Sequence, residues 1–141
     1  SWVMEIPPDV TTITRQILET HKDIKQLEGV DRVLFKTQNS NLWETHSSAF
    51  QENYVGLDSS GAHLLAEMRL KLIGLDYLSI ASYKDTQNPH QILLSQGITL
   101  LEGINLSGIT SGPYQLVCAP LLIQGCEGAP VRAFLIRYDY E

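Results

Sequence analysis

Hydrophobic and polar residues follow two different periods along this chain, and the change from one to the other predicts the order of its elements. Short apolar runs bounded by Gly, Pro or polar residues are typical of buried strands. Apolar residues that recur three and four positions apart are typical of a helix packed along one face. The expected strands span residues 2–6, 31–37, 72–75, 98–101, 114–119 and 131–137, and the expected helices span residues 11–27, 60–69 and a short stretch from residue 88.

Capping residues mark where these helices begin. Side-chain oxygens of Ser, Thr, Asp and Asn accept hydrogen bonds from the free N–H groups of a first helical turn. The candidate caps are Thr11, Thr12 or Thr14 for the first helix, Asp58 or Ser59 for the second, and Asn88 for the third. Pro89 then occupies the first position of the third helix, where its missing N–H costs nothing.

Residues 38–57 show neither period. They are rich in Asn, Ser and Gln, with Trp43, Phe50 and Tyr54 spaced among them, and we expect a long loop. A loop of about twenty residues is uncommon in a compact domain and is usually functional or disordered. The remaining order, with helices interleaved in the first half and strands dominating the second, predicts an α/β fold. At 141 residues, we expect one domain, residues 1–141.

The net charge and the cysteine content limit which binding partners and which cellular compartment we expect. The net charge of −6 leaves nothing that could neutralise a row of phosphates, so we expect no nucleic-acid partner. No apolar run reaches the length of a membrane span, and we expect no membrane partner. Cys118 and Cys126 form neither a C-x-x-C pair nor a disulfide framework. We expect free, partly buried thiols in a reducing, cytoplasmic compartment.

The first residues raise a question about what precedes them. The chain opens with SWVMEIPPDV, an apolar strand-like run without an initiator Met. A strand that starts at the second residue usually follows another element, so we expect an upstream portion to be missing. The alternative is removal of Met ahead of Ser1.

His90 and Glu102 are the candidate metal ligands. A neutral imidazole and a carboxylate suit zinc or manganese, and two separate elements would hold them rigidly. Two ligands are too few on their own, because a catalytic zinc needs about three protein ligands and an open position. The alternative is that His90 is an exposed residue of a first helical turn and that Glu102 is a carboxylate at the edge of a strand.

Other polar residues are weaker candidates for a functional site. His21 is flanked by Lys22 and Asp23, so we expect it on a solvated helix face, and neither His46 nor His63 has a carboxylate at ligand spacing. Asp76 follows the 72–75 strand directly. A carboxylate in that position caps the next loop or lines a cleft, and we expect the structural role.

Five stretches, taken in order, resemble a known family. They are GVDRVLFKT, FQENYVGLDSSGAHLLAE, LIGLDYLSIA, the segment from His90 to Glu102, and GPYQLVCAPLLIQGCEGAPVRAFL. Together they look like the C-terminal two thirds of the putative cyclase family, whose metal-dependent hydrolases include bacterial kynurenine formamidase and isatin hydrolase. The resemblance runs from about Val3 to Ile136.

The resemblance implies a fold, a metal and a reaction. The fold is an α/β domain of the swivelling β/β/α type, and the metal centre, usually zinc or manganese, hydrolyses amide bonds in small aromatic or cyclic substrates. The late His and Glu of such proteins are metal ligands, and they match His90 and Glu102. Trp43, Phe50 and Tyr54 would then stack on an aromatic substrate or pack against a second subunit; the alternative is that they only anchor the loop. A homo-oligomer, dimer or tetramer, is expected.

One departure from the family pattern matters as much. The family's other ligands come from an H-x-G-T-H-x-D motif with a further His nearby as general acid/base, and this motif would lie before Trp2. We therefore assign no catalytic residue in this chain, and we expect it to hold metal poorly and to be inactive alone. The alternative is a shortened, non-catalytic homologue that acts as a binding or oligomeric scaffold module. A cyclase or lyase reaction on the same scaffold also stays open.

Overall fold

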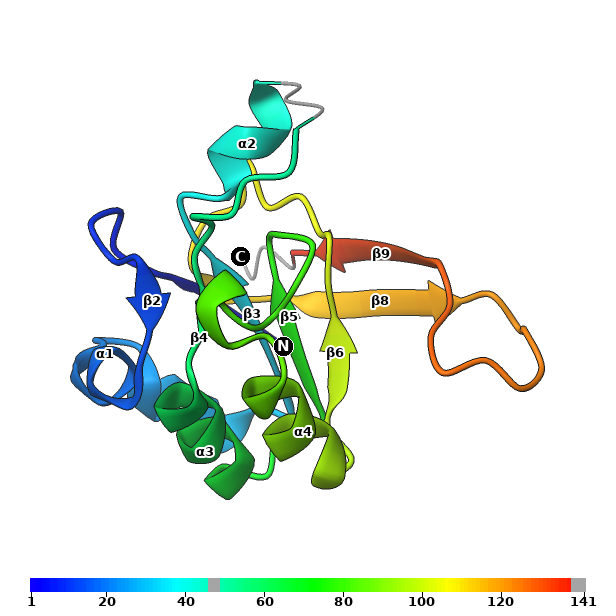
Figure 1. Ribbon diagram of the computed structural model, residues 1–141, viewed down its shortest axis with the longest axis horizontal. Helices are drawn as coiled ribbons and strands as arrows, with labels where there is room; N and C mark the ends of the chain where they lie inside the picture. The colour runs from blue at the N-terminus through cyan, green and yellow to red at the C-terminus, as the bar shows by residue number, and fades with distance from the viewer. Residues whose placement is uncertain (46–48, 138–141) are drawn as a thin grey trace.

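A five-stranded, mostly parallel sheet forms the centre of the computed structural model, which describes residues 1–45 and 49–137 (Figure 1). Across the sheet the strands are β6 (Thr99–Leu101), β5 (Leu72–Leu75), β3 (Arg32–Lys36), β1 (Trp2–Glu5) and β7 (Gly112–Pro113). The first four run parallel, and only β7 is antiparallel to its neighbour β1. The carboxyl ends of four strands therefore meet at one edge, where ligands bind in open α/β sheets.

Alternate residues of these strands point to opposite faces of the sheet and build two separate cores. Val33 and Phe35 of β3 join one core, whereas Leu34 between them joins the other. In the same way Ile73 of β5 lies on the first face and Leu72 on the second. Because both faces are covered, the central residues of β3 and β5 are apolar on both sides rather than at every second position.

Helices cover the first face. They are α1 (Arg15–Thr20), α3 (Ser59–Glu67) and α4 (Asn88–Ser95), together with the 3-10 helix η1 (Ile24–Gly29). Leu18, Leu65 and Leu93, one from each α-helix, are fully excluded from solvent and pack with the strand residues of this core. Thr14 caps α1 and Asp58 caps α3 through side-chain bonds to the backbone N–H groups of Ile17 and Gly61.

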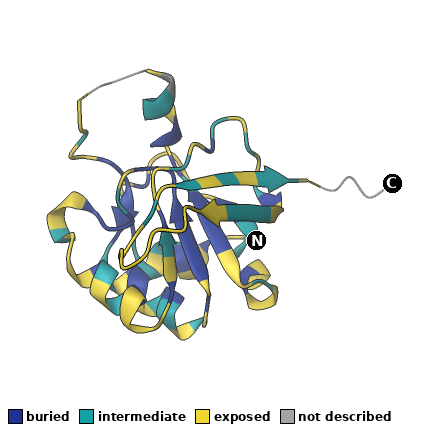
Figure 2. Cartoon of the chain, turned by 90° about the vertical axis from the view of Figure 1, so that its right-hand side faces the viewer, coloured by how far each residue is buried: buried dark blue, intermediate teal, exposed yellow. Residues whose placement is uncertain are grey.

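A loop and a two-stranded ribbon cover the second face. The crossing segment, residues 102–111, runs from β6 toward β7 at the opposite edge of the sheet. The ribbon consists of β8 (Gln115–Pro120) and β9 (Val131–Ile136), which extend away from the body (Figure 1). In Figure 2 the central strands are buried, whereas every ribbon residue is intermediate or exposed. The second core is therefore only partly closed.

Two sequence expectations about the first half of the chain are wrong. Residues 11–27 do not form one helix: the strand β2 (Thr12–Ile13) precedes α1, and the chain leaves the helix at His21, whose backbone is extended. The His21 ring reaches the Glu5 carbonyl oxygen over 2.9 Å, a contact that a continuous helix would not provide. Nothing in the local period reveals a partner sixteen residues away.

Residues 38–57 are also more ordered than a long loop. They contain α2 (Ser40–Glu44) and β4 (Gly56–Leu57), and β4 pairs in parallel with β2. Asn39 closes this segment: its amide donates to the Val55 oxygen and its carbonyl accepts from the Val55 nitrogen, both at 2.8 Å. The side chain thus imitates a strand partner, which a residue-by-residue propensity does not predict.

The remaining expectations are confirmed with small shifts. The strands expected at 72–75, 98–101, 114–119 and 131–137 are present, and the α/β class is correct. Gln87 rather than Asn88 precedes α4, and the short 3-10 helix η2 (Tyr83–Asp85) comes before it. None of the helices within the described ranges is both long and apolar enough to cross a membrane.

Candidate metal site

His90 and Glu102 lie against each other at the edge of the sheet. His90 is in the first turn of α4, and Glu102 follows directly after β6. Their Nε2 and Oε1 atoms are 3.1 Å apart. The two side chains keep 29% and 33% of their surface exposed, so the pair is reachable from solvent. The packing of α4 beside β6 therefore converts a twelve-residue separation into direct contact.

The hydrogen bond at Nδ1 of His90 determines whether Nε2, the nitrogen that faces Glu102, carries a proton or a lone pair. Nδ1 lies 2.6 Å from the Thr86 carbonyl oxygen, which can only accept, so Nδ1 carries a proton. In the neutral ring Nε2 is then a lone-pair donor aimed at a carboxylate oxygen. Two acceptors at this distance repel each other unless a cation satisfies both, and that cation is either a proton on Nε2 or a metal ion. A backbone carbonyl that fixes the tautomer in this way is a common feature of His ligands.

Glu102 is held on one oxygen only. Its Oε1 accepts the backbone N–H of Ile80 at 2.8 Å, besides facing His90. Among the described residues, its Oε2 has no hydrogen-bond partner. One oxygen thus fixes the orientation of the carboxylate, and the other is available to a ligand.

Two cavities meet at Glu102. The larger, of about 1020 Å³, separates α4 and β6 from the ribbon and is lined by His90, Glu102 and apolar residues of β8. The smaller, of about 440 Å³, lies between the crossing segment and β9 and also includes Glu102. The carboxylate therefore sits where the incompletely closed face of the sheet opens to solvent.

The three aromatic residues singled out from the sequence take different positions. Trp43 and Phe50 line a cavity of about 180 Å³ with Tyr77 and Leu78. Tyr54 is only 4% exposed and stacks on Tyr77, with ring centroids 4.5 Å apart. Two of the predicted residues thus line a cavity, and Tyr54 is a buried residue that packs against Phe50 and Tyr77.

This aromatic cavity adjoins the metal-site candidate through the backbone. The Gly103 N–H, next to Glu102, donates to the Tyr77 carbonyl oxygen at 2.6 Å. Phe50 is 49% exposed and lies 5.8 Å from the rings of Tyr54, Tyr77 and Tyr83. Tyr77 and Tyr83 were missed by the sequence argument, because neither lies in the segment without a clear period.

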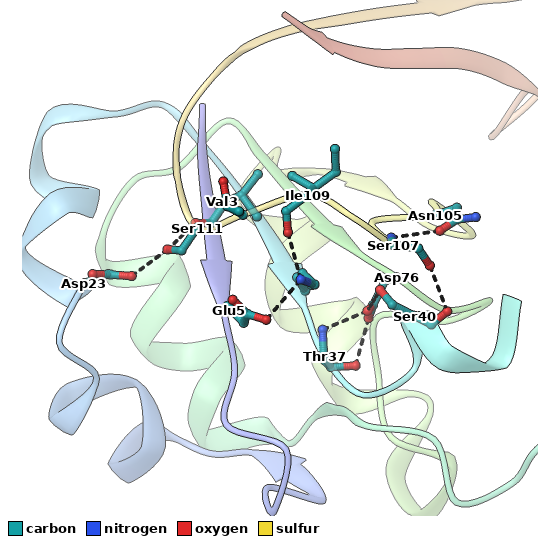
Figure 3. Close-up of polar contacts among 12 residues, drawn as sticks. Val3, Glu5, Asp23, Thr37, Ser40, Asp76, Asn105, Ser107, Ile109 and Ser111 are labelled. Atoms are coloured by element: carbon teal, nitrogen blue, oxygen red, sulfur yellow. Dashed lines mark hydrogen bonds and ion pairs between the residues drawn. The ribbon is translucent and has the colours of Figure 1, made fainter. Parts of the chain in front are cut away.

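Asp76 is the most deeply buried carboxylate of the described residues. Its oxygens accept from the Thr37 nitrogen at 2.7 Å, the Thr37 hydroxyl at 2.9 Å and the Ser40 hydroxyl at 2.6 Å (Figure 3). Burial raises the pKa of Asp76, and these donors oppose that rise. The carboxylate joins the ends of β3 and β5, which agrees with the structural role expected from the sequence.

The crossing segment is fixed to the same edge of the sheet. The Ser107 hydroxyl donates to the Ser40 carbonyl oxygen, Lys36 Nζ to the Ile109 oxygen and the Ser111 hydroxyl to the Val3 oxygen (Figure 3). These bonds are 3.1, 2.8 and 2.9 Å long. The path of the chain immediately after Glu102 is therefore set by contacts with β1, β3 and α2.

Among the described residues, the other histidines and the cysteines supply no further ligand beside His90 and Glu102. His21 is buried, which corrects the expectation of a solvated face, and its ring is bonded to the Glu5 oxygen and the Asp23 nitrogen. His63 is exposed on α3, and His46 lies outside the described residues. Cys118 is partly buried and Cys126 exposed, both as free thiols. Within residues 1–45 and 49–137, no three His, Cys, Asp or Glu side chains gather closely enough to hold a metal ion.

Comparison with known proteins shows which proteins this chain is similar to. Residues 2–82 match the family model described as putative cyclase. The chain is 36% identical over 137 residues to cyclase-like protein 3 of Oryza sativa subsp. japonica, covering 96% of this chain and 49% of that protein. It is 36% identical over 115 residues to a kynurenine formamidase of Salinibacter ruber, covering 79% and 53% respectively.

A solved structure is similar over nearly the whole chain. It is described as a potential metal-dependent hydrolase with cyclase activity, and it superposes with a TM-score of 0.79 at 26% identity. The match covers 95% of this chain and 62% of that one. This chain thus spans about half the length of the curated relatives it matches.

Proposed function

Because this chain belongs to the putative cyclase family, we propose that it forms one domain-sized portion of a metal-dependent hydrolase that cleaves an amide bond in a small aromatic or cyclic molecule. A hydrolase family is supported by the kynurenine formamidase and metal-dependent hydrolase relatives. Fold similarity does not fix a reaction, so the proposal depends on the site. The observation that carries it is the convergence of His90 Nε2 and Glu102 Oε1.

The donor set fits a divalent zinc or manganese ion. His90 would supply an imidazole nitrogen and Glu102 a carboxylate, both ligand types that these metals accept. When bound, such a metal acts as a Lewis acid and lowers the pKa of a coordinated water toward neutrality. The described residues bring only two ligands together. We propose that the remaining ligands and the proton-transferring group come from polypeptide beyond the described residues or from another subunit.

The other residues of the site orient these two ligands. The Thr86 carbonyl keeps the proton on Nδ1 and so leaves Nε2 free to bind. The Ile80 N–H holds Oε1 and leaves Oε2 unpaired among the described residues. Because both orienting groups belong to the backbone, the geometry of the pair depends on how the segments around residues 80 and 86 are packed.

Trp43 and Phe50 are the proposed contacts for the ring of the substrate. They line one cavity whose Tyr77 neighbour is bonded to Gly103, beside Glu102. An aromatic ring placed there gains stacking contacts with side chains that lose little conformational freedom on binding. An aryl formamide has both a small ring and an amide bond, and one relative is named a kynurenine formamidase.

The ribbon is the proposed surface for assembly into a dimer or tetramer. Phe134 on β9 is exposed, as are Leu121 and Leu122 in the loop between β8 and β9, and Leu122 is completely so. Among the described residues β8 and β9 pair only with each other, so no third strand joins either side of the ribbon. Exposed apolar edges of this kind favour pairing with another chain.

Calorimetric titration with zinc and manganese tests the proposal. The chain is expected to bind one of these ions weakly, and Glu102→Gln is expected to abolish binding, because an amide keeps the Ile80 contact but loses the charge. Circular dichroism of the variant controls for folding. Absence of metal binding by the folded wild-type chain contradicts the metal-site proposal and favours the scaffold module instead. Size-exclusion chromatography with light scattering tests the proposed assembly independently.

A further inference from the structure

We propose that Tyr54 is a positioning residue for Glu102, acting through the backbone of residues 80–82. The inference rests on the proposed metal-binding function. Within the described part of the chain, Tyr54 forms no hydrogen bond with His90 or Glu102; its hydroxyl donates to the Ala81 carbonyl oxygen at 2.5 Å. Ala81 is the immediate neighbour of Ile80, whose N–H orients the carboxylate. One hydrogen bond and one residue of backbone therefore link the tyrosine to the N–H that holds the proposed ligand.

The segment 80–82 lies beyond the end of β5 and is held by β4. The Leu57 N–H donates to the Ile80 oxygen at 2.8 Å, and the Ser82 N–H donates to the Leu57 oxygen at 2.9 Å. Gly56 permits this approach, since a Cβ at this residue would lie 2.5 Å from the Ser82 nitrogen and 2.6 Å from the Ala81 carbonyl carbon. The direction of the Ile80 N–H thus follows from the packing of residues 54–57.

Tyr54 also packs against the residue that holds the backbone directly after Glu102. Its ring stacks on Tyr77, whose carbonyl oxygen accepts the N–H of Gly103. Tyr54 is therefore bonded to the residue after Ile80 and stacked on the residue whose carbonyl holds Gly103, the neighbour of Glu102. Because Tyr54 is buried, water cannot readily replace its hydroxyl at the Ala81 oxygen.

Tyr77 offers a matched control for a purely structural role. It is buried like Tyr54 and belongs to the same stack, but its hydroxyl accepts the Gln51 N–H instead of contacting segment 80–82. Tyr54→Phe and Tyr77→Phe each remove one phenolic oxygen and keep the stacked rings, so both variants are expected to fold. Only Tyr54→Phe removes a bond to the segment that orients Glu102.

The experiment measures zinc affinity by calorimetry and the Ile80 amide by NMR in the wild-type chain and both variants. Tyr54→Phe is expected to weaken zinc binding several-fold, less than the roughly 10- to 100-fold that loss of a direct partner of a ligand costs. The Ile80 amide signal is expected to shift and to exchange faster with solvent. Tyr77→Phe is expected to leave the zinc affinity and the Ile80 signal as in the wild type.

Two results overturn the inference: an unchanged Ile80 amide in Tyr54→Phe, or equal losses of zinc affinity in both variants. Either would make Tyr54 an ordinary core residue. A wild-type chain that binds no zinc is a different failure, because it contradicts the proposed function. The Ile80 amide would in that case still decide whether Tyr54 controls the N–H that holds Glu102.

Discussion

The two faces of the central sheet are closed by different means. On the first, helices bury residues such as Leu18, Leu65 and Leu93 completely. On the second, the ribbon residues Leu116, Val131 and Leu135 pack against the core yet remain partly exposed. A helix satisfies its own backbone hydrogen bonds as it packs, whereas a two-stranded ribbon leaves two edges unpaired. The proposed site lies on the less closed side, where Glu102 borders both cavities.

The difference teaches that one face of the sheet supplies a fully packed core, whereas the other leaves open volume beside Glu102. A fully packed face tolerates no cavity, because close packing has little free volume. A half-closed face contributes less to the free energy of unfolding but can admit a ligand. The same strands serve both purposes, since alternate residues such as Phe35 and Leu34 belong to different cores.

The largest expected effect compares one leucine from each face. Leu65→Ala removes a fully buried side chain, so we expect the free energy of unfolding to fall by about 2–5 kcal/mol. Leu135→Ala, the same substitution at a partly exposed residue of β9, is expected to cost less than half as much. Urea denaturation followed by circular dichroism measures both values. Equal losses would mean that the ribbon closes its face as tightly as the helices do.

Asp76→Ala tests the point where β3 and β5 are joined. The substitution leaves the Thr37 N–H and the Ser40 hydroxyl without an acceptor in a buried place. Each unsatisfied group of this kind costs about 1–3 kcal/mol, so we expect a loss in this range or slightly above. Asp76→Asn is the matched control, because it keeps the shape and one acceptor. If the alanine variant were as stable as the asparagine variant, the hydrogen bonds to Asp76 would not contribute to the free energy of unfolding.

The pH dependence of the same residue is a smaller effect. Burial raises the pKa of Asp76 above its ordinary value of 3.8, so the folded state binds this proton more tightly than the unfolded state does. Its contribution to stability is therefore complete below about 3.8 and is lost as pH rises through the folded-state pKa. Relative to Asp76→Asn, the wild type is expected to lose stability between pH 4 and neutrality, as measured by urea denaturation at several pH values. A constant difference across that range would contradict the raised pKa.

The smallest expected effect on stability is at the outward side of the ribbon. Phe134→Ser replaces a half-exposed side chain, and we expect the free energy of unfolding to change by no more than about 0.5 kcal/mol. If the ribbon mediates assembly, the same substitution lowers the oligomer size in light scattering. Arg132→Ser, an exposed neighbour on β9, serves as the control. A large loss of stability without a change in assembly would place Phe134 in the core of the second face.

Local patterns in the sequence were sufficient wherever an element is defined by its own residues. The 72–75 strand is apolar throughout and is buried throughout. Asp58 and Thr14, two of the suggested caps, do cap α3 and α1. His90 and Glu102 were paired on a family resemblance, and the structure places them in contact, while their role as ligands stays a prediction.

Contacts between distant residues produced the features that the sequence did not predict. His21 ends α1 by bonding to Glu5, and Asn39 closes the 38–57 segment by bonding to Val55. The two tyrosines that accompany Phe50 come from residues 77 and 83, far along the chain from the segment that was singled out. Periodicity and capping describe neighbours in sequence and contain no information about such partners.

The sequence by itself determined the α/β class and the buried strands, because the apolar period is a local property, whereas the pairing of His90 with Glu102 in the candidate site came from a resemblance to a known family. Only the tertiary structure decided how that site is oriented. The proton on His90 follows from the Thr86 carbonyl, the free oxygen of Glu102 from the Ile80 N–H, and the direction of that N–H from the packing of Gly56. Each of these is a backbone group placed by a neighbouring element, and any residue type can donate or accept through its backbone.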